Sequence, residues 1–243
     1  MRILSSKKLS PMLPTIIIPG YFARTQEYQN LAQSLTTMGL PTAIVPLTIS
    51  DWLPTVGGRS MVPILRKIDA TVRQAQEKYS SSQVNIIGHS AGGWIARIYL
   101  GEIPYTVHGD VTDGEGCWKA HPQVSHLVTL GTPHVSLEPW TRKNLDFVKN
   151  NYPGAFYPQV KYICVAGRAV SGEQRWQNWL AFNSYQITCG VGNTWGDGIT
   201  PIEAAHLEGA INLTIPEVFH SPRRQGLWYG SPEIIPQWAV YLA

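Results

Sequence analysis

A short stretch of the chain, NIIGHSAGGW at residues 85–94, has the spacing of a catalytic turn. Ser90 stands between Gly88 and Gly92 in a G-x-S-x-G pattern, with an apolar run before it and an apolar stretch after it. A serine in a sharp strand-to-helix turn presents its hydroxyl above a helix N-terminus, where developing negative charge is stabilised. We therefore expect Ser90 to be a nucleophile for acyl transfer. The alternative is a glycine-rich turn without catalysis, because short matches of this kind also arise by chance.

The elements that would position Ser90 alternate along the chain between short apolar runs and helical patterns. The runs predict strands at 15–18, 42–45, 84–87, 125–130, 160–165 and 211–215. Apolar residues spaced by three or four predict helices between the runs, the clearest over 61–79 with Ser60 as its cap. This alternation predicts one α/β domain over 1–243, with a mainly parallel sheet of about six strands and helices on both faces. Ligands of such sheets bind beyond the carboxyl ends of the strands.

Three blocks of sequence carry a resemblance to a known superfamily. They are IIIPGYF at 16–22, GHSAGG at 88–93 with LGTPH at 130–134, and GDGITP at 196–201 followed by His220. In these blocks the chain resembles the α/β-hydrolase superfamily, and within it lipases and inositol-deacylase-like lipid deacylases. The blocks span most of the chain in the order of that superfamily. The resemblance implies an α/β-hydrolase fold and a triad in the chain order serine, acid, histidine.

The implied order leaves two histidines as the base, His206 and His220. Four others precede the best acid: His108, His121, His126 and His134. His89 is expected to point away from the turn and to be structural. His206 lies in TPIEAAHLEG, whose pattern predicts an ordinary helix that is capped by Thr200 and ends at Gly209. His220 follows the last predicted strand in a loop at the carboxyl edge, so we choose it as the base and keep His206 as the alternative.

Asp197 is the expected acid of the triad. It stands between two glycines in GDGITP, in the loop where the superfamily's acid usually lies. The other aspartates after the serine lie in a polar loop (Asp110 and Asp113) and on an expected exposed helix face (Asp146). The alternative for Asp197 is a glycine turn in which the carboxylate binds only its own backbone.

Two backbone amides must stabilise the negative oxygen of a tetrahedral intermediate. The amide of Ala91, directly after the serine, supplies one, and the resemblance to lipases implies that Tyr21 supplies the other. Many bacterial lipases have His-Gly in the preceding loop, whereas this chain has Pro19-Gly20. A different contact must therefore order that loop.

Aromatic residues crowd the loops that should overhang the carboxyl edge. They include Tyr21, Trp140 and, within RWQNWLAFNSY, Trp176, Trp179, Phe182 and Tyr185. We expect Phe22, Trp52 and Trp94 to bind substrate, with packing in the core as the alternative. These residues favour a hydrophobic ester.

Composition limits the remaining functions. The net charge of +3 is too small for nucleic-acid binding, and the sequence has neither a metal-ligand motif nor a nucleotide-binding fingerprint, so we expect no metal and no cofactor. The three cysteines cannot all pair within the chain, which favours a reducing, cytoplasmic environment. The opening residues MRILSSKKLSPMLP lack the apolar run of a signal peptide, and no segment has the length of a membrane span, so any membrane contact would be peripheral.

The expected function is a serine ester hydrolase of the lipase or esterase type, which cleaves carboxylic esters of hydrophobic or lipid substrates through an acyl-enzyme. One alternative is a thioesterase or acyltransferase with the same triad, and another is a non-catalytic binding protein on a hydrolase scaffold. We also expect lid or cap segments near 103–122 and 168–195, since long connections of this kind are often functional.

Overall fold

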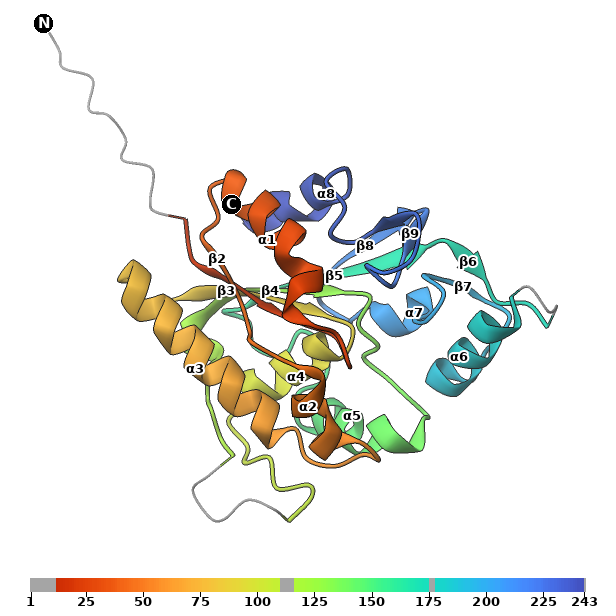
Figure 1. The fold of residues 1–243 in the computed structure, drawn as a ribbon. Helices are drawn as coiled ribbons and strands as arrows, with labels where there is room; N and C mark the ends of the chain where they lie inside the picture. The colour runs from red at the N-terminus through yellow and green to blue at the C-terminus, as the bar shows by residue number, and fades with distance from the viewer. Residues whose placement is uncertain (1–11, 110–115, 175–177, 243) are drawn as a thin grey trace, which may run out of the picture.

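A computed structural model describes residues 12–109, 116–174 and 178–242 of the chain (Figure 1). Its centre is a parallel six-stranded sheet in the order β2-β1-β3-β4-β5-β8. The strands are β1 (Thr15–Ile18), β2 (Thr42–Ile44), β3 (Val84–His89), β4 (Val124–Leu130), β5 (Lys161–Arg168) and β8 (Ile211–Pro216). The predicted fold class is therefore confirmed, and the strand positions agree to within a few residues.

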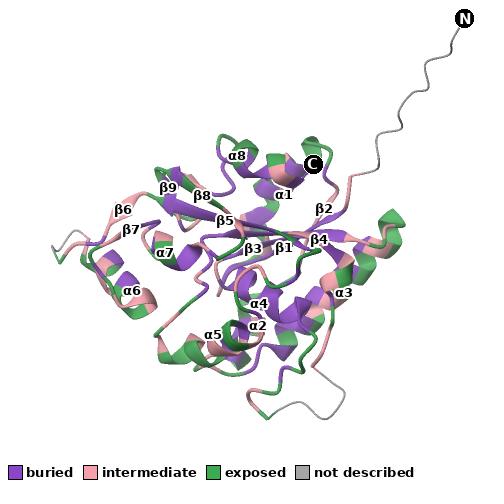
Figure 2. Cartoon of the chain, turned by 180° about the vertical axis from the view of Figure 1, so that it is seen from behind, coloured by how far each residue is buried: buried purple, intermediate pink, exposed green. Residues whose placement is uncertain are grey.

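Helices cover both faces of this sheet. On one face lie α1 (Gln29–Thr37), preceded by the 3-10 helix η1 (Thr25–Tyr28), and α8 (Ile235–Ala239), which leads into η4 (Val240–Leu242). On the other face lie α3 (Val62–Tyr79), α4 (Ala91–Leu100) and α5 (Pro139–Asn151). Figure 1 shows the first group above the sheet and the second below it, and Figure 2 shows the buried strands between the two layers.

The strands divide their side chains between two hydrophobic cores. In β1, Ile16 and Ile18 pack in the core that includes α3 and α4, whereas Ile17 packs in the core that includes α1. This follows from the alternation of side chains across a strand. At the sheet edge, β8 instead exposes Asn212 and Thr214. The inner strands β1 and β3 are buried along their whole length and are mainly apolar, with Thr15, Asn85 and His89 as their buried polar residues.

The segment after β5 forms a small unit of its own at the carboxyl end of the sheet. It contains β6 (Val170–Ser171), α6 (Trp179–Cys189) and β7 (Trp195–Gly196), of which β6 and β7 pair antiparallel. The short helix α7 (Ile202–Ala205) follows, and later β9 (Val218–Phe219) and β10 (Leu227–Trp228) form a parallel pair. The expected cap near 168–195 covers part of this segment, and its role as a cap stays a prediction. Trp176 lies outside the described residues.

The other expected lid, 103–122, ends in the 3-10 helix η3 (His121–Gln123). Tyr105 is fully buried and its hydroxyl donates to Asn144 of α5. The described hydrogen bonds of His108 also go to Asn144. These contacts hold the segment against the helical layer. Asp110 and Asp113 lie outside the described residues, and a lid function for this segment stays a prediction.

Two helix boundaries differ from the predicted ones. The helix α3 is preceded by Met61 rather than by Ser60, although the Ser60 hydroxyl does accept a hydrogen bond from the Val62 amide. The helix expected from Thr200 to Gly209 is reduced to α7, because the Thr200 hydroxyl donates to the Gly131 carbonyl across the fold instead of capping.

The remaining short helices are α2 (Ile49–Trp52) and η2 (Leu53–Thr55), which follow β2. Among the described residues, no helix has both the length and the apolar character needed to cross a bilayer.

Candidate active site

The turn at Ser90 has the backbone geometry of a strained elbow. Ser90 joins β3 to α4 with φ 53° and ψ −122°, a conformation that non-glycine residues rarely adopt. The space around the turn admits only glycine at the two flanking positions. A Cβ added at Gly88 would lie 2.4 Å from the Gly93 Cα, and a Cβ added at Gly92 would lie 2.4 Å from the Ile18 carbonyl oxygen. Tight packing around the turn thus maintains a backbone conformation that is unfavourable for an isolated serine.

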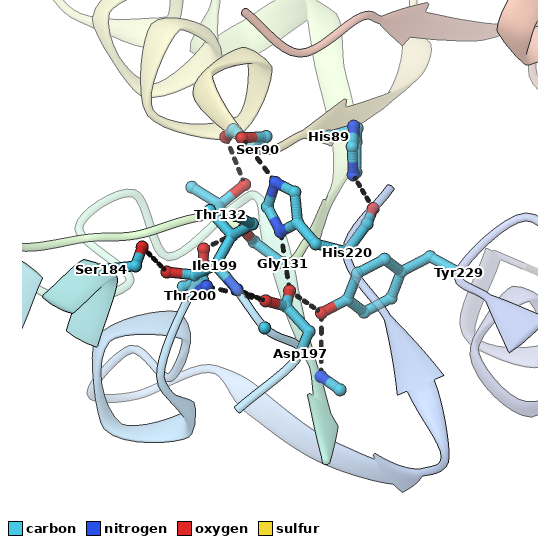
Figure 3. A network of polar contacts seen from close by, with 12 residues as sticks. His89, Ser90, Gly131, Thr132, Ser184, Asp197, Ile199, Thr200, His220 and Tyr229 are labelled. Atoms are coloured by element: carbon cyan, nitrogen blue, oxygen red, sulfur yellow. Dashed lines mark hydrogen bonds and ion pairs between the residues drawn. The ribbon is translucent and has the colours of Figure 1, made fainter. Parts of the chain in front are cut away.

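Ser90, His220 and Asp197 form one line of hydrogen bonds (Figure 3). The His220 Nε2 atom lies 3.0 Å from the Ser90 Oγ, and its Nδ1 atom lies 2.7 Å from the Asp197 Oδ2. A carboxylate only accepts hydrogen bonds, so the Nδ1 atom carries the proton and the Nε2 lone pair faces the serine hydroxyl. This is the tautomer that a general base needs.

The Asp197 carboxylate is buried and fully engaged, with 1% of the residue exposed. Its Oδ1 accepts from the amides of Ile199 and Thr200, and its Oδ2 accepts from His220 and from the Tyr229 hydroxyl at 2.6 Å. Burial by itself raises the pKa of Asp197, but the charge of His220 and these hydrogen bonds outweigh it and lower the pKa below the usual value. Asp197 therefore stays ionised, with an orientation set by four donors.

Tyr229 is a site residue that the sequence did not suggest. Its hydroxyl accepts from the Gly167 amide at 2.8 Å and donates to Asp197, so it ties the carboxylate to the end of β5. Burial and then the charge of Asp197 raise its pKa well above the ordinary value, which keeps the hydroxyl protonated and able to donate. The residues around Tyr229 in the sequence form no pattern from which its contact with Asp197 could be predicted.

The other candidates for base and acid lie apart from Ser90. The His206 Nε2 atom contacts the Thr214 hydroxyl at 3.2 Å. Asp146 forms an ion pair with Arg142 on the exposed side of α5. Of the residues considered as base or acid, the structure brings His220 and Asp197 to the serine.

The two expected oxyanion amides flank the serine. Ala91 is the first residue of α4, so its amide has no carbonyl partner within the helix. The loop of Tyr21 passes close to the nucleophile, since a Cβ added to the preceding Gly20 would lie 3.0 Å from the Ser90 Cβ. Within the described part of the chain, the structure assigns neither amide a protein acceptor. A role of both amides in binding a substrate oxygen stays a prediction.

A small cleft of about 90 Å³ opens beside the serine and is lined by Tyr21, Ser90 and His220. Arg223 closes its rim, donating from Nε to Glu27 at 2.9 Å and from its guanidinium to the Phe22 carbonyl at 3.1 Å. A larger groove of about 730 Å³ shares the Glu27 and Arg223 walls. The reaction centre is therefore accessible, but only through a narrow space.

The three aromatic residues expected to bind substrate occupy different surroundings. Phe22 is 38% exposed at the loop after β1, in a left-handed conformation. Trp52 is fully buried against the Tyr21 ring, at a centroid distance of 4.7 Å, and Trp94 is 1% exposed within α4. The prediction for Trp52 and Trp94 is corrected: both rings are buried in the hydrophobic core that includes α3 and α4.

No group of three His, Cys, Asp or Glu side chains in the described ranges has the arrangement of a metal site. The polar groups around Ser90 are instead satisfied by one another.

Comparisons with known proteins agree with this architecture. Residues 65–173, from α3 to just beyond β6, match a family model described as an alpha/beta hydrolase of unknown function (DUF915). The fold is similar to an alpha-beta serine hydrolase homologue from Coxiella burnetii, with a TM-score of 0.52 and 12% identity over 97% of this chain and 86% of that one. It is also similar to Est1E from Butyrivibrio proteoclasticus, with a TM-score of 0.49 and 13% identity over 97% of this chain and 90% of that one. A search of curated proteins found no match.

The described part of the chain therefore has the α/β-hydrolase fold, and residues 65–173 are similar to an α/β-hydrolase family. At 12% identity the Coxiella burnetii structure supports the fold alone, and the chemistry must be argued from the site itself.

Proposed function

We propose that this protein is a serine hydrolase that cleaves carboxylic esters through an acyl-enzyme. The observation that carries the proposal is the unbroken line of hydrogen bonds from the buried Asp197 through His220 to the Ser90 hydroxyl. A thiol or metal nucleophile is not needed, because a neutral histidine with its free lone pair on the serine is the arrangement that makes a hydroxyl reactive.

The proposed reaction has two halves. The Ser90 Oγ attacks the ester carbonyl carbon while its proton passes to the His220 Nε2, and the amides of Tyr21 and Ala91 hold the negative oxygen. The tetrahedral intermediate collapses, the alcohol leaves with the proton from His220, and the acyl group remains on the serine. A water molecule then gives one proton to His220 and attacks the acyl carbon. This second tetrahedral intermediate breaks its bond to the Ser90 Oγ, His220 returns the proton to that oxygen, and the acid is released. Asp197 stays ionised throughout and stabilises the imidazolium.

The surroundings of the site favour a hydrophobic acyl group. The cleft of about 90 Å³ is far smaller than the 300 to 1,000 Å³, roughly, that enclose a drug-sized ligand, so it takes the carbonyl end of a chain. A groove of about 620 Å³ runs past Phe219, the neighbour of His220, and is lined by Leu180, Trp195 and Ile199. We propose that the rest of a longer acyl chain lies in this groove.

Exposed apolar side chains on the cap extend this surface. The helix α6 exposes three large apolar side chains, which are Trp179, Leu180 and Ile187. Residues of these types are usually buried in soluble domains. Such a surface suits peripheral contact with a lipid layer, where aromatic rings lie at the headgroup level. We therefore propose lipid esters, presented at an interface, as substrates of the site.

Labelling with a fluorophosphonate probe tests the nucleophile directly. We expect one modified residue, Ser90, located by peptide mass spectrometry, and no labelling after Ser90→Ala. A native protein that remains unlabelled would favour a non-catalytic binding protein on this scaffold.

A panel of p-nitrophenyl esters and matched thioesters, of increasing chain length, tests the substrate. Leu180→Ser should lower kcat/KM for long-chain esters by about fivefold, the factor that about 1 kcal/mol of lost apolar contact produces, and leave acetate esters unchanged. Val240→Ser is the matched control, because Val240 is similarly exposed but lies outside the groove. Faster turnover of the thioesters, or of an added acyl acceptor, would identify a thioesterase or acyltransferase instead.

A further inference from the structure

We propose that Tyr28 and His89 act as positioning residues, which hold the loop of Tyr21 and the base His220 in one fixed arrangement around the nucleophile. This inference rests on the proposed ester hydrolysis and goes beyond it, because neither residue touches the reacting atoms. We call the pair the Tyr28–His89 bridge.

The bridge is a chain of three hydrogen bonds. The Gly20 amide donates to the Tyr28 hydroxyl at 2.9 Å, and this hydroxyl lies 2.7 Å from the His89 Nδ1. The His89 Nε2 lies 2.9 Å from the main-chain carbonyl oxygen of His220. Figure 3 shows the last of these contacts, on the side of His220 away from Asp197.

The position of each proton follows from the donors available. The His220 carbonyl oxygen can only accept, so His89 carries its proton on Nε2 and donates it there. The Nδ1 atom of the neutral ring is then an acceptor, and the Tyr28 hydroxyl, which accepts from Gly20, donates to it. Burial, and then the charge of His220, lower the pKa of His89 to about 3, so the ring remains neutral. Each hydrogen bond of the bridge therefore has only one possible donor.

The bridge joins three parts of the chain that are distant in sequence. Gly20 belongs to the loop after β1, His89 is the last residue of β3, and His220 follows β9. Tyr28 and His89 are both buried, and the Trp228 ring packs against each of them at a centroid distance of 5.8 Å. A connection of buried side chains therefore runs from the Tyr21 loop to the backbone of His220.

This connection explains how the Pro19–Gly20 loop is ordered without a histidine of its own. The Gly20 amide donates to Tyr28, whereas the next amide, that of Tyr21, has no acceptor among the described residues. Since His89 directly precedes Ser90, the same ring sets the oxyanion loop and the base relative to the nucleophile. Displacing either by a fraction of an ångström lowers the rate of the chemical step rather than the binding of the ester.

The test compares Tyr28→Phe, His89→Ala and His89→Gln with the wild-type protein. Tyr28→Phe should lower kcat by about tenfold to 100-fold, with KM for a short-chain ester changed less than about twofold. The affinity for an alkyl boronic acid, which mimics the tetrahedral intermediate on Ser90, should fall by the same factor as kcat. His89→Ala should have at least as large an effect.

His89→Gln is the rescuing variant, because a glutamine amide accepts at one atom and donates at the other, as the neutral ring does. We expect it to recover most of the lost kcat. Tyr99→Phe is the matched control: Tyr99 is fully buried and its hydroxyl donates to Asp69 on α3, so its loss affects stability but not the site. Folded fractions are measured by circular dichroism before the rates are compared.

Two results separate this inference from the proposed function. If the wild-type protein hydrolyses esters through Ser90 but Tyr28→Phe and His89→Ala keep its kcat and its boronic acid affinity, the positioning role is wrong while the function stands. A wild-type protein without ester hydrolysis would overturn the proposed function and the positioning role together.

Discussion

Two buried histidines in this protein each lie beside a potential nucleophile, but only one has the arrangement that the proposed reaction needs. His220 has Ser90 on one side and Asp197 on the other. His134, in the LGTPH block, has its Nε2 atom 3.5 Å from the Cys164 Sγ. Both rings are buried, so neither burial nor proximity to a nucleophile distinguishes the two clusters.

The third group of each cluster makes the difference. The Arg97 guanidinium, which can only donate, lies 3.2 Å from the His134 Nδ1. His134 therefore carries its proton on Nε2, toward Cys164, and has no lone pair to offer the thiol. Burial, and then the charge of Arg97, lower the pKa of His134 well below its usual value, and burial raises the pKa of Cys164 to about 11.

In each histidine, the partner of Nδ1 thus determines whether Nε2 presents a lone pair or a proton to the neighbouring hydroxyl or thiol. An acceptor, Asp197, turns the free lone pair of His220 toward a hydroxyl. A donor, Arg97, turns the proton of His134 toward a thiol and leaves a structural cluster, in which Arg97 also holds the Tyr152 and Gly154 carbonyls. The spacing of residues in the sequence predicts neither the contact of Arg97 with His134 nor its effect on the proton.

Exchanging the acceptor for an amide should make His220 resemble His134. In Asp197→Asn the side-chain oxygen stays with the Ile199 and Thr200 amides, so the new NH₂ group faces His220 and moves its proton to Nε2. We expect kcat to fall by about 10⁴, the loss that follows from the wrong tautomer, with KM little changed. Steady-state kinetics with a short-chain ester measures this effect.

Asp146→Asn serves as the control for this change, because Asp146 is an exposed partner of Arg142. A fall of less than tenfold in Asp197→Asn would show that the acceptor is not needed for the tautomer.

The thiol of the second cluster should be unreactive. A pKa of about 11 in place of 9.0 lowers the thiolate fraction at pH 8 by about 100-fold, and burial excludes the reagent as well. Iodoacetamide treatment of the native protein, followed by peptide mass spectrometry, should modify the partly exposed Cys117 and Cys189 at least about 100-fold faster than Cys164. Comparable rates at all three would contradict the raised pKa and the burial of Cys164.

The neutral state of His134 should make the protein sensitive to acid. Its folded pKa is depressed below the unfolded value of 6.5, so the stabilisation is present above pH 6.5 and is lost as the pH falls below it. Between pH 7.5 and 5.0 this one group should lower the free energy of unfolding by about 2 kcal/mol. Urea denaturation at both pH values measures the change.

His134→Gln sharpens this prediction, because glutamine accepts from Arg97 and donates toward Cys164 but does not titrate. The loss of stability between the two pH values should be smaller by about 2 kcal/mol in the variant. An unchanged pH dependence would mean that the folded protein already accepts a proton at His134.

Several features of the site follow from residues that are neighbours in the sequence. The elbow at Ser90 depends on Gly88 and Gly92, whose positions two residues away are set by the strand-to-helix turn itself. The order of strands and helices follows from apolar periodicity, which depends on windows of a few residues. These parts of the molecule were predictable for that reason.

The aromatic residues show the limit of the same approach. Trp52 and Trp94 were expected at the substrate, but both are in the core, because the direction of a ring depends on which face of its helix meets the sheet. Tyr28 and Tyr229 were not expected at the site at all, although their hydroxyls contact His89 and Asp197 across 61 and 32 residues of sequence. No local pattern records such contacts.

The sequence by itself determined the α/β architecture, the strained turn at Ser90 and the chain order that singled out Asp197 and His220. Only the tertiary structure decided where the protons of the buried histidines lie. The physical reason is that a proton goes to the nitrogen whose partner can accept it, and those partners come from segments that are brought together only when the sheet and its two helical layers have formed.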